Sequence, residues 1–300
     1  MLTIFAIPKP FQGQAREAQD NAIRSWKASN SGAAIVLCGD EEGIREACER
    51  HGVHHLPDVE LSEFGTPLIS SAFSRVFADF PTPSHLYLNC DIILIDDLSP
   101  MIGKVGLKSF LGVARRINID MVGDLDTESS DWAAKIRLQA ESAGKVDELT
   151  AIDWFLMKGE GPWRDPPPFI VGRPHWDNWM VFAARRAGKH VVDFSSSVAV
   201  IHQNHGYSHV PQRLGPRWGG PEAAVNQVLA EWAGSFNRRG QVFSIAHSTA
   251  NFNGEQLRRN LTWDRIRAEY RLAPNTVPFL AGPLYWLQDI HGSLRGRKKE

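Results

Sequence analysis

The stretch "SHLYLNCDIILIDDL", residues 84–98, is an apolar run that carries Asn89 and Asp91 in its middle. Such a run predicts a buried strand, in which successive side chains point to opposite faces of the sheet. Asn89 and Asp91 would then share one face, with Cys90 on the other. Burying a carboxylate without a partner costs free energy. The pair is therefore expected at a strand end near solvent or against a cation.

Asn89 and Asp91 have the chemistry of a divalent-metal site. Mg²⁺ and Mn²⁺ prefer oxygen ligands and commonly bridge protein carboxylates to substrate phosphates. The alternative is an aspartate that accepts hydrogen bonds from main-chain N–H groups in a turn. The following pair, Asp96 and Asp97, is typical of a solvated turn or a helix cap.

The chain before residue 84 alternates apolar runs with helical periodicity. Strands are expected at 2–8, 33–40 and 53–58, and helices at 14–29, 41–52 and 65–80. This order predicts a parallel sheet with helices on its faces, a Rossmann-like nucleotide-binding half. Gly52 is expected to close the second helix, and Thr66 to cap the third. No Gly-rich dinucleotide fingerprint follows the first strand, which weakens an NAD-binding interpretation.

Candidate ligand contacts follow the ends of these strands, because ligands of such sheets bind beyond the carboxyl ends. Asp40 ends the second strand, where it could contact a nucleotide or cap a helix that starts at Glu41. Asn89 and Asp91 end the fourth. Arg115 and Arg116 could pair with a diphosphate, since guanidinium groups match phosphate oxygens, or could form a solvated basic pair.

The second half of the chain is less regular. Strands are expected over 109–121 and 149–159, a helix over 129–144 and another from 176. Asp153, at the end of the strand 149–159, is a candidate acceptor contact or base, with a plain turn residue as the alternative. Asp177 lies in the first turn of its helix, where a carboxylate commonly caps the helix and is stabilised by the helix dipole.

Composition describes an ordinary globular protein. The 300 residues are 43% hydrophobic and 22% charged, with a net charge of −1, which predicts no general attraction to nucleic acid. Cys38, Cys48 and Cys90 lack paired or metal-site spacing and are interpreted as reduced thiols. A cytoplasmic location is expected, either free or peripheral at the inner face of a membrane through the C-terminal segment. "VPFLAGPLYWLQDI", residues 277–290, is the nearest approach to a membrane span and is too short.

At this point the chain resembles a known family. "LNCDIIL" is similar to the Asp-x-Asp metal motif of nucleotide-sugar glycosyltransferases with the GT-A fold, with Asn in the first position. "FIVGRPHWDNWMVFAARRAGKHVVD", residues 169–193, resembles the segment of inverting members in which a Gly-containing loop leads to an acidic general base. "VIHQNH", residues 200–205, resembles the strand whose His completes the metal shell. The similarity covers residues 1–210 and is closest to family-two-like bacterial transferases.

The resemblance implies a mixed, mainly parallel GT-A sheet and a role for particular residues. Asp177 would be the base, with His202 as the matching histidine and His205 as the runner-up. Because Asn89 removes one negative charge, the ion would bind more weakly or only together with the nucleotide. Combined with the positional arguments above, the predicted site residues fall into three groups. They are Asp177 and Asp153 for catalysis; Pro8, Lys9, Asp40, Thr66, Asn89, Cys90, Asp91 and Arg115 for the nucleotide sugar; and Asn89, Asp91 and His202 for Mn²⁺ or Mg²⁺.

The predicted organisation is a catalytic domain over 1–210, divided into a nucleotide-binding half (1–98) and an acceptor half (99–210), followed by a helical extension over 211–300. The predicted activity is transfer of a sugar from a UDP- or GDP-sugar to a glycan, lipid-linked or small-molecule acceptor. Alternatives are a sugar nucleotidyltransferase, for which "PKPFQGQAR" (8–16) is a poor phosphate loop, and an inactive nucleotide- or carbohydrate-binding domain, which Asn89 favours. The tryptophans at 163, 176 and 179 could contact a sugar ring or form core.

Overall fold

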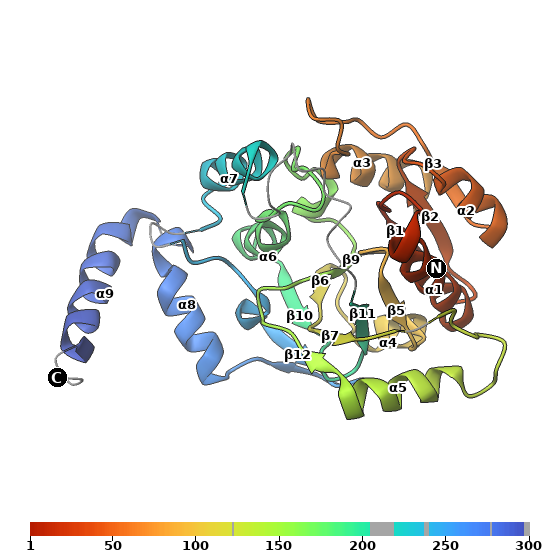
Figure 1. Cartoon of the computed structure of the whole chain (residues 1–300). Helices are drawn as coiled ribbons and strands as arrows, with labels where there is room; N and C mark the ends of the chain where they lie inside the picture. Colours follow the sequence, from red (N-terminus) through yellow and green to blue (C-terminus); the bar gives the residue numbers. More distant parts are fainter. Residues whose placement is uncertain (122, 205–218, 237–239, 277, 297–300) are drawn as a thin grey trace.

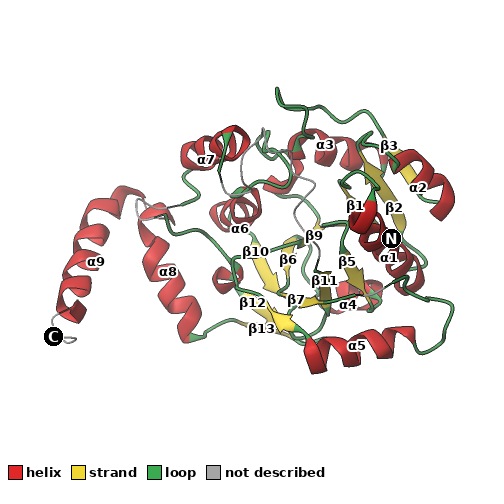
Figure 2. Ribbon diagram, viewed as in Figure 1, coloured by secondary structure: helices red, strands yellow, loops and turns green. Residues whose placement is uncertain are grey.

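The fold is built on a nine-stranded sheet with helices on both faces (Figures 1 and 2). The computed structural model describes residues 1–121, 123–204, 219–236, 240–276 and 278–296. The order of the main sheet is β13-β12-β10-β6-β9-β4-β1-β2-β3. A mixed α/β fold with a mainly parallel sheet, as the sequence predicts, is confirmed.

The first half forms the predicted strand–helix alternation. Strands β1 to β4 are mutually parallel in the order β3-β2-β1-β4. Its elements are β1 (Leu2–Ala6), α1 (Gly13–Ser29), β2 (Ala34–Cys38), α2 (Ile44–His51), β3 (His54–Leu56), α3 (Ile69–Asp79) and β4 (Ser84–Leu88). Gly52 closes α2 in the left-handed conformation, at φ 61°, as predicted. The strands alternate their side chains between two apolar clusters, one on each face of the sheet.

The prediction that Thr66 caps α3 is wrong. The helix begins at Ile69 after Leu68, and no side chain caps it. Residues before it are extended because Leu61 bridges Pro67 and Leu68 bridges Ile170. One local bridge and one bridge to a distant segment therefore outweigh the capping preference.

The apolar run 84–94 is two strands rather than one. β4 ends at Leu88 and β5 (Ile92–Leu94) belongs to a second, four-stranded sheet of order β5-β11-β7-β8. The chain leaves one sheet and enters the other across residues 89–91. The polar residues in the middle of the run are thus a turn between sheets.

The second half adds strands to both sheets. Its elements up to residue 204 are α4 (Leu98–Lys104), β6 (Phe110–Val113), β7 (Arg116–Ile119), α5 (Trp132–Ala143), β8 (Lys145–Val146), β9 (Trp154–Lys158), α6 (Trp176–Arg186), β10 (His190–Asp193) and β11 (Val200–Gln203). Asp97 caps α4 by accepting a hydrogen bond from the Ser99 N–H at 3.0 Å, one of the two roles predicted for it. β9 runs antiparallel between β4 and β6.

The predicted position of Asp153 at the end of a strand is wrong. Asp153 precedes Trp154, the first residue of β9. Because β9 is antiparallel to β4, the start of β9 lies beside the end of β4, with Trp154 paired to Leu88. The reversed strand direction therefore carries Asp153 to the edge where Asn89 lies.

Residues 219–296 contain strands as well as helices, so they are more than the helical extension predicted. β12 (Ala250–Phe252) pairs in parallel with β10, and β13 (Leu257–Arg259) closes the edge of the main sheet. The helices are α7 (Pro221–Ala233), α8 (Trp263–Thr276) and α9 (Ala281–Gly296), and α9 lies at the periphery beyond α8 (Figure 1). A domain boundary at 210 stays a prediction. Within the described residues no helix has the length and apolarity needed to cross a membrane.

Candidate active site

The turn between β4 and β5 brings together a carboxylate, an imidazole and an ammonium group. Asp91 Oδ2 lies 3.2 Å from Lys9 Nζ and 3.9 Å from His202 Nε2. Asp91 and His202 are both buried, at 6% and 7% exposure, whereas Lys9 is half-buried. His202 reaches this place because β11 pairs with β5, with His202 opposite Ile92. A buried carboxylate is thus compensated by an ammonium group supplied from the end of β1.

The main chain of this turn is fixed by its neighbours. The Asn89 N–H donates to the Asp153 carbonyl at 3.1 Å, and the Gln203 N–H donates to the Asp91 carbonyl at 3.2 Å. Lys9 is held in the same way by a buried side chain of α1. Gln19 accepts from the Lys9 N–H at 2.7 Å and donates to the Lys9 carbonyl at 3.0 Å. These bonds fix the backbone on both sides of the Lys9–Asp91 pair.

The Asn89 amide is oriented by two partners. Its Nδ2 donates to Asp153 Oδ1 at 2.8 Å, and the Tyr87 hydroxyl donates to its Oδ1 at 3.4 Å. Burial raises the pKa of Tyr87 well above its ordinary value, so its hydroxyl keeps the proton that it donates. Asn89 here links β4 to the carboxylate of Asp153.

Asp153 belongs to a chain of paired charges. Its second oxygen accepts a hydrogen bond from Arg116, whose guanidinium also lies 2.6 Å from Asp147 Oδ2. Burial acts to raise the pKa of Asp147, but hydrogen bonds from Asn118, the Glu148 N–H and Arg116 outweigh it and lower the pKa to about 2. Both aspartates are therefore held as partners of one guanidinium, on a side chain that is 12% exposed.

Asp177 lies in the first turn of α6, where it is half-buried. Its Oδ1 accepts the Asn178 N–H at 2.9 Å. The neighbouring Trp176 is buried and packs against Tyr87, with ring centroids 5.1 Å apart, and against Phe155 at 5.3 Å. Tyr87 and Phe155 are each two residues from Asn89 and Asp153, so α6 starts against the same two strand ends.

The loop before α6 is held by α7. Asn226 exchanges two hydrogen bonds with the main chain of Ile170 and donates to the Pro174 carbonyl at 3.1 Å. Arg173 forms a buried ion pair with Glu222. The N-cap residue of α6, His175, has φ 84°, a left-handed conformation that residues other than glycine seldom adopt. Contacts from the C-terminal segment thus fix the start of the helix that carries Asp177.

The other predicted nucleotide contacts lie in different environments. Pro8 is buried directly after β1, and Asp40 is exposed after β2, with its Oδ1 3.9 Å from His55 Nε2. α2 starts at Ile44 after Gly43, so capping of a helix at Glu41 by Asp40 is not seen. Because β1, β2 and β4 are adjacent and parallel, Lys9, Asp40 and Asn89 follow strand ends at one edge of the sheet.

Three predicted residues are engaged elsewhere. The Thr66 hydroxyl donates to Glu222 of α7 at 2.5 Å. The Cys90 side chain is buried in the core, and burial raises its pKa well above the ordinary value, so only its main chain remains to contact a ligand. The Arg115 guanidinium donates to the Asp147 carbonyl at 2.6 Å. His205 lies outside the described residues.

Sequence reasoning missed the residues that hold the site together. Gln19, Gln203 and Asp147 carry no local signal, because each acts on a segment at least 10 residues away. Arg116 was paired with Arg115 as a phosphate contact, and its partners are carboxylates instead. The tryptophans at 163, 176 and 179 are buried at 1%, 5% and 7% exposure, so they belong to the core rather than to a sugar-binding surface.

Asp91 and His202 lie close enough together to bind the same divalent ion. Bonds to Mg²⁺ are about 2.1 Å long, so two ligands of one ion lie at most about 4.2 Å apart. The 3.9 Å between Asp91 Oδ2 and His202 Nε2 satisfies this limit. Within the described part of the chain, no group of three His, Cys, Asp or Glu side chains could hold a metal. The residues therefore fit an ion with two protein donors and the remaining positions filled by phosphate and water.

Comparison with known proteins returned structural similarities only. No protein-family model matches the chain, and no curated protein matches it. The chain is similar to mannosyltransferase PcManGT from Pyrobaculum calidifontis in complex with GDP-Man and Mn²⁺, with a TM-score of 0.44 and 10% identity over 98% of this chain and 79% of that one. It is similar to glucosyl-3-phosphoglycerate synthase from Mycobacterium tuberculosis in complex with Mg²⁺ and UDP, with a TM-score of 0.41 and 12% identity over 76% and 77%. Because both TM-scores are below 0.5, these similarities assign no role to any residue of the site.

Replacing Arg116 by Met should destabilise the protein strongly, because it leaves Asp153 and Asp147 without their shared cation. Breaking a buried ion pair from one side typically costs about 3–5 kcal/mol. Urea unfolding at neutral pH measures the loss. Lys104→Met is the matched control, since the Lys104–Glu255 pair is exposed and should contribute at most about 1 kcal/mol. Equal, small losses in both variants would show that Arg116 is not needed to hold the aspartates.

Proposed function

We propose that this protein is a nucleotide-sugar glycosyltransferase of the GT-A type that transfers a sugar with inversion. One observation carries the proposal: Asp91 and His202 approach each other, beside Lys9, where the parallel strands of the nucleotide-binding half end. Donors of this class present a diphosphate, and ligands of such sheets bind at this edge. The protein acts as an enzyme, a hexosyltransferase, in this proposal.

The nucleotide sugar would lie along the carboxyl ends of β1, β2 and β4. Asp40, exposed at the end of β2, would contact the base or ribose, and the ammonium group of Lys9, which pairs with Asp91, would contact phosphate oxygens. Asp91 and His202 would hold Mn²⁺ or Mg²⁺, with Asn89 next to them. When bound, the ion would neutralise charge on the departing nucleoside diphosphate. UDP- and GDP-sugars are the proposed donors.

Asp177 is the proposed general base. An acceptor hydroxyl forms a bond to the anomeric carbon, the bond from that carbon to the diphosphate breaks, and the hydroxyl proton passes to the Asp177 carboxylate. Asp153 suits this task less well. It is 6% exposed, and its two oxygens are already bound by Asn89 and Arg116, whereas Asp177 is half-buried at a helix start.

Asp177→Asn should leave donor binding nearly unchanged and reduce transfer by at least about 100-fold, the usual contribution of a general base. Titration calorimetry with UDP and GDP measures binding, and release of nucleoside diphosphate from a panel of nucleotide sugars measures turnover. If the variant loses binding and turnover in equal measure, Asp177 has a structural role. A wild-type protein that binds nucleotide but turns over no donor would favour the inactive binding domain.

Asp91→Asn should abolish the Mn²⁺-dependent increase in nucleotide affinity, because the amide removes the anionic ligand.

Lys9→Met should instead strengthen the binding of Mn²⁺. Removing the ammonium group from Asp91 should tighten Mn²⁺ binding in the absence of nucleotide by about tenfold, or about 1.4 kcal/mol. Calorimetric titration of Mn²⁺ into each protein, with and without UDP, provides the measurement. Unchanged Mn²⁺ affinity in both variants would remove Asp91 from the metal site.

Contact with a membrane surface is the proposed role of the C-terminal helices. Trp263, Phe279 and Trp286 are 74%, 82% and 62% exposed, and residues 258–300 contain nine Lys or Arg against four Asp or Glu. Aromatic side chains with nearby basic residues suit an anionic lipid surface.

Vesicle flotation should recover wild-type protein with anionic but not neutral vesicles, and Phe279→Ser/Trp286→Ser should lose most of this binding. Trp232→Ser is the control, because Trp232 is 93% exposed but lies on α7. Equal binding of all three proteins would contradict the proposal.

A further inference from the structure

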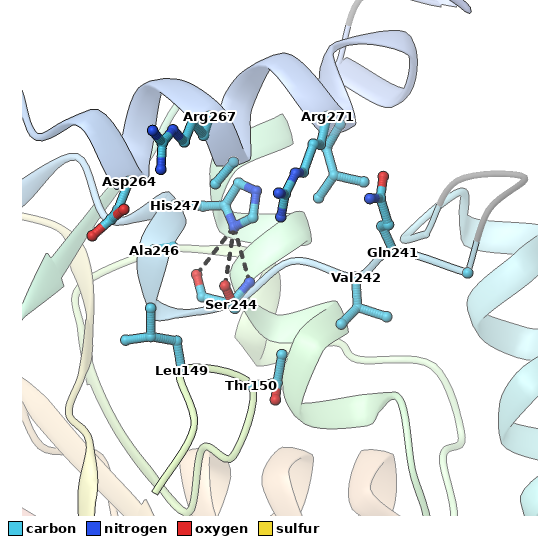
Figure 3. Close-up of a pocket in the computed structure, with 13 residues that line it drawn as sticks. Leu149, Thr150, Gln241, Val242, Ser244, Ala246, His247, Asp264, Arg267 and Arg271 are labelled. Atoms are coloured by element: carbon cyan, nitrogen blue, oxygen red, sulfur yellow. Dashed lines mark hydrogen bonds between the residues drawn. The ribbon is translucent and has the colours of Figure 1, made fainter. Parts of the chain in front are cut away.

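The structure contains a cavity apart from the Asp91 turn. It has a volume of about 440 Å³ and lies between α8 and two loop segments, 149–150 and 240–247 (Figure 3). α8 lines it with Asp264, Arg267, Ala268, Arg271 and Leu272. The spacing of these residues places them on one face of the helix, so the two arginines, four residues apart, both line the cavity.

We infer that this cavity binds an oxyanion, a phosphate or carboxylate group, on a small acceptor molecule. In Figure 3 the two arginines descend from α8 on either side of His247, with Arg271 between His247 and Gln241. Guanidinium groups bind oxyanions through paired N–H donors, and Gln241 and Thr150 add polar groups to the wall. A volume of this size suits a small molecule rather than a polymer.

The charges around the cavity favour an anion. Asp264 is the one acidic side chain among the lining residues, against two arginines. Glu269, on the same helix, is occupied by Arg185 at 2.7 Å and Arg265 at 3.6 Å. His247 is buried, which lowers its pKa and keeps it neutral near pH 7. Among the described residues that line the cavity, basic side chains thus outnumber acidic ones.

Hydrogen bonds connect the segments that form the walls of the cavity. Ser244 and His247 form a capping box, in which the Ser244 N–H donates to His247 Nδ1 at 3.0 Å. The Ile245 N–H donates to the Leu149 carbonyl at 3.0 Å, which joins the two loop segments. These two hydrogen bonds hold together the segments that form the cavity walls.

The same walls connect the cavity to the proposed base. Asn178, the residue after Asp177, donates to the Phe243 carbonyl at 2.7 Å and to the Thr150 carbonyl at 3.4 Å. Thr150 is also three residues from Asp153. An anion held here would lie beside the start of α6. Assignment of the anion to the acceptor rests on the proposed function, whereas anion binding itself does not.

The test is titration of the purified full-length protein with inorganic phosphate and, separately, with acetate, followed by calorimetry. Wild-type protein should bind at least one of them, and Arg267→Gln/Arg271→Gln should weaken that binding at least tenfold. Preference for phosphate would indicate a phosphorylated acceptor, and preference for acetate a carboxylated one; both outcomes support the inference.

Arg258→Gln/Arg259→Gln is the matched control. It removes the same charge from β13, outside the cavity, and should change affinity less than twofold. Lys9→Met instead reports any phosphate that binds at the Asp91 turn rather than in this cavity. The single variant Arg267→Gln, at an exposed position, serves if the double variant unfolds and should weaken binding severalfold.

Three results would overturn the inference: no binding of either anion to wild-type protein, equal weakening by the two double variants, or loss of binding only in Lys9→Met. Failure of the proposed function would look different. Phosphate or acetate would still bind through Arg267 and Arg271, while no nucleotide sugar was turned over.

Discussion

The reversed direction of β9 is the constraint on which the candidate site depends. In a fully parallel sheet, Asp153 would lie at the edge opposite Asn89. Because β9 is antiparallel between β4 and β6, Asp153 meets Asn89 side chain to side chain and main chain to main chain. The same strand places Phe155 against Trp176, so the start of α6 reaches this edge too. One strand inserted in reverse thus joins the strands of residues 1–98 to the half of the chain that carries Asp177.

Charge compensation explains how so many ionisable groups can be held at this edge. Asp91 is paired with Lys9, and Asp153 with Arg116, which also binds Asp147. Buried carboxylates require such partners, because desolvation otherwise raises their free energy. The two pairs differ in exposure, since Lys9 is half-buried at a strand end while Arg116 is enclosed by its aspartates. The Lys9 side chain is 33% exposed, whereas the Arg116 side chain is 12% exposed.

Residues 219–296 contribute directly to the region around Asp177. Asn226 and Glu222 of α7 fix the loop before α6, and the segment around Phe243 accepts a hydrogen bond from Asn178. α8 then supplies the arginines of the cavity that adjoins the start of α6. Substitutions in α7 can consequently alter the geometry at Asp177 without touching it, through the loop 170–175.

The sequence by itself determined the features that depend on near neighbours in the chain. Apolar runs identified the strands of the first half, periodicity identified α1, and Gly52 and Asp97 marked helix ends, because a left-handed residue and a capping carboxylate act within a few residues. The polar turn at 89–91 was visible in the sequence as an anomaly in an apolar run. Its position between two sheets was not, since the choice of sheet depends on pairing with β11.

Only the tertiary structure decided which distant groups meet. The segment after Thr66 illustrates this, because the bridge between Leu68 and the distant Ile170 opposes the local capping preference. Segments far apart in the chain also meet at β9, in the pairing of Arg116 with Asp153, and in the cavity lined by two arginines. Their energies come from burial and charge pairing between those segments, and no local pattern of residue types records such contacts.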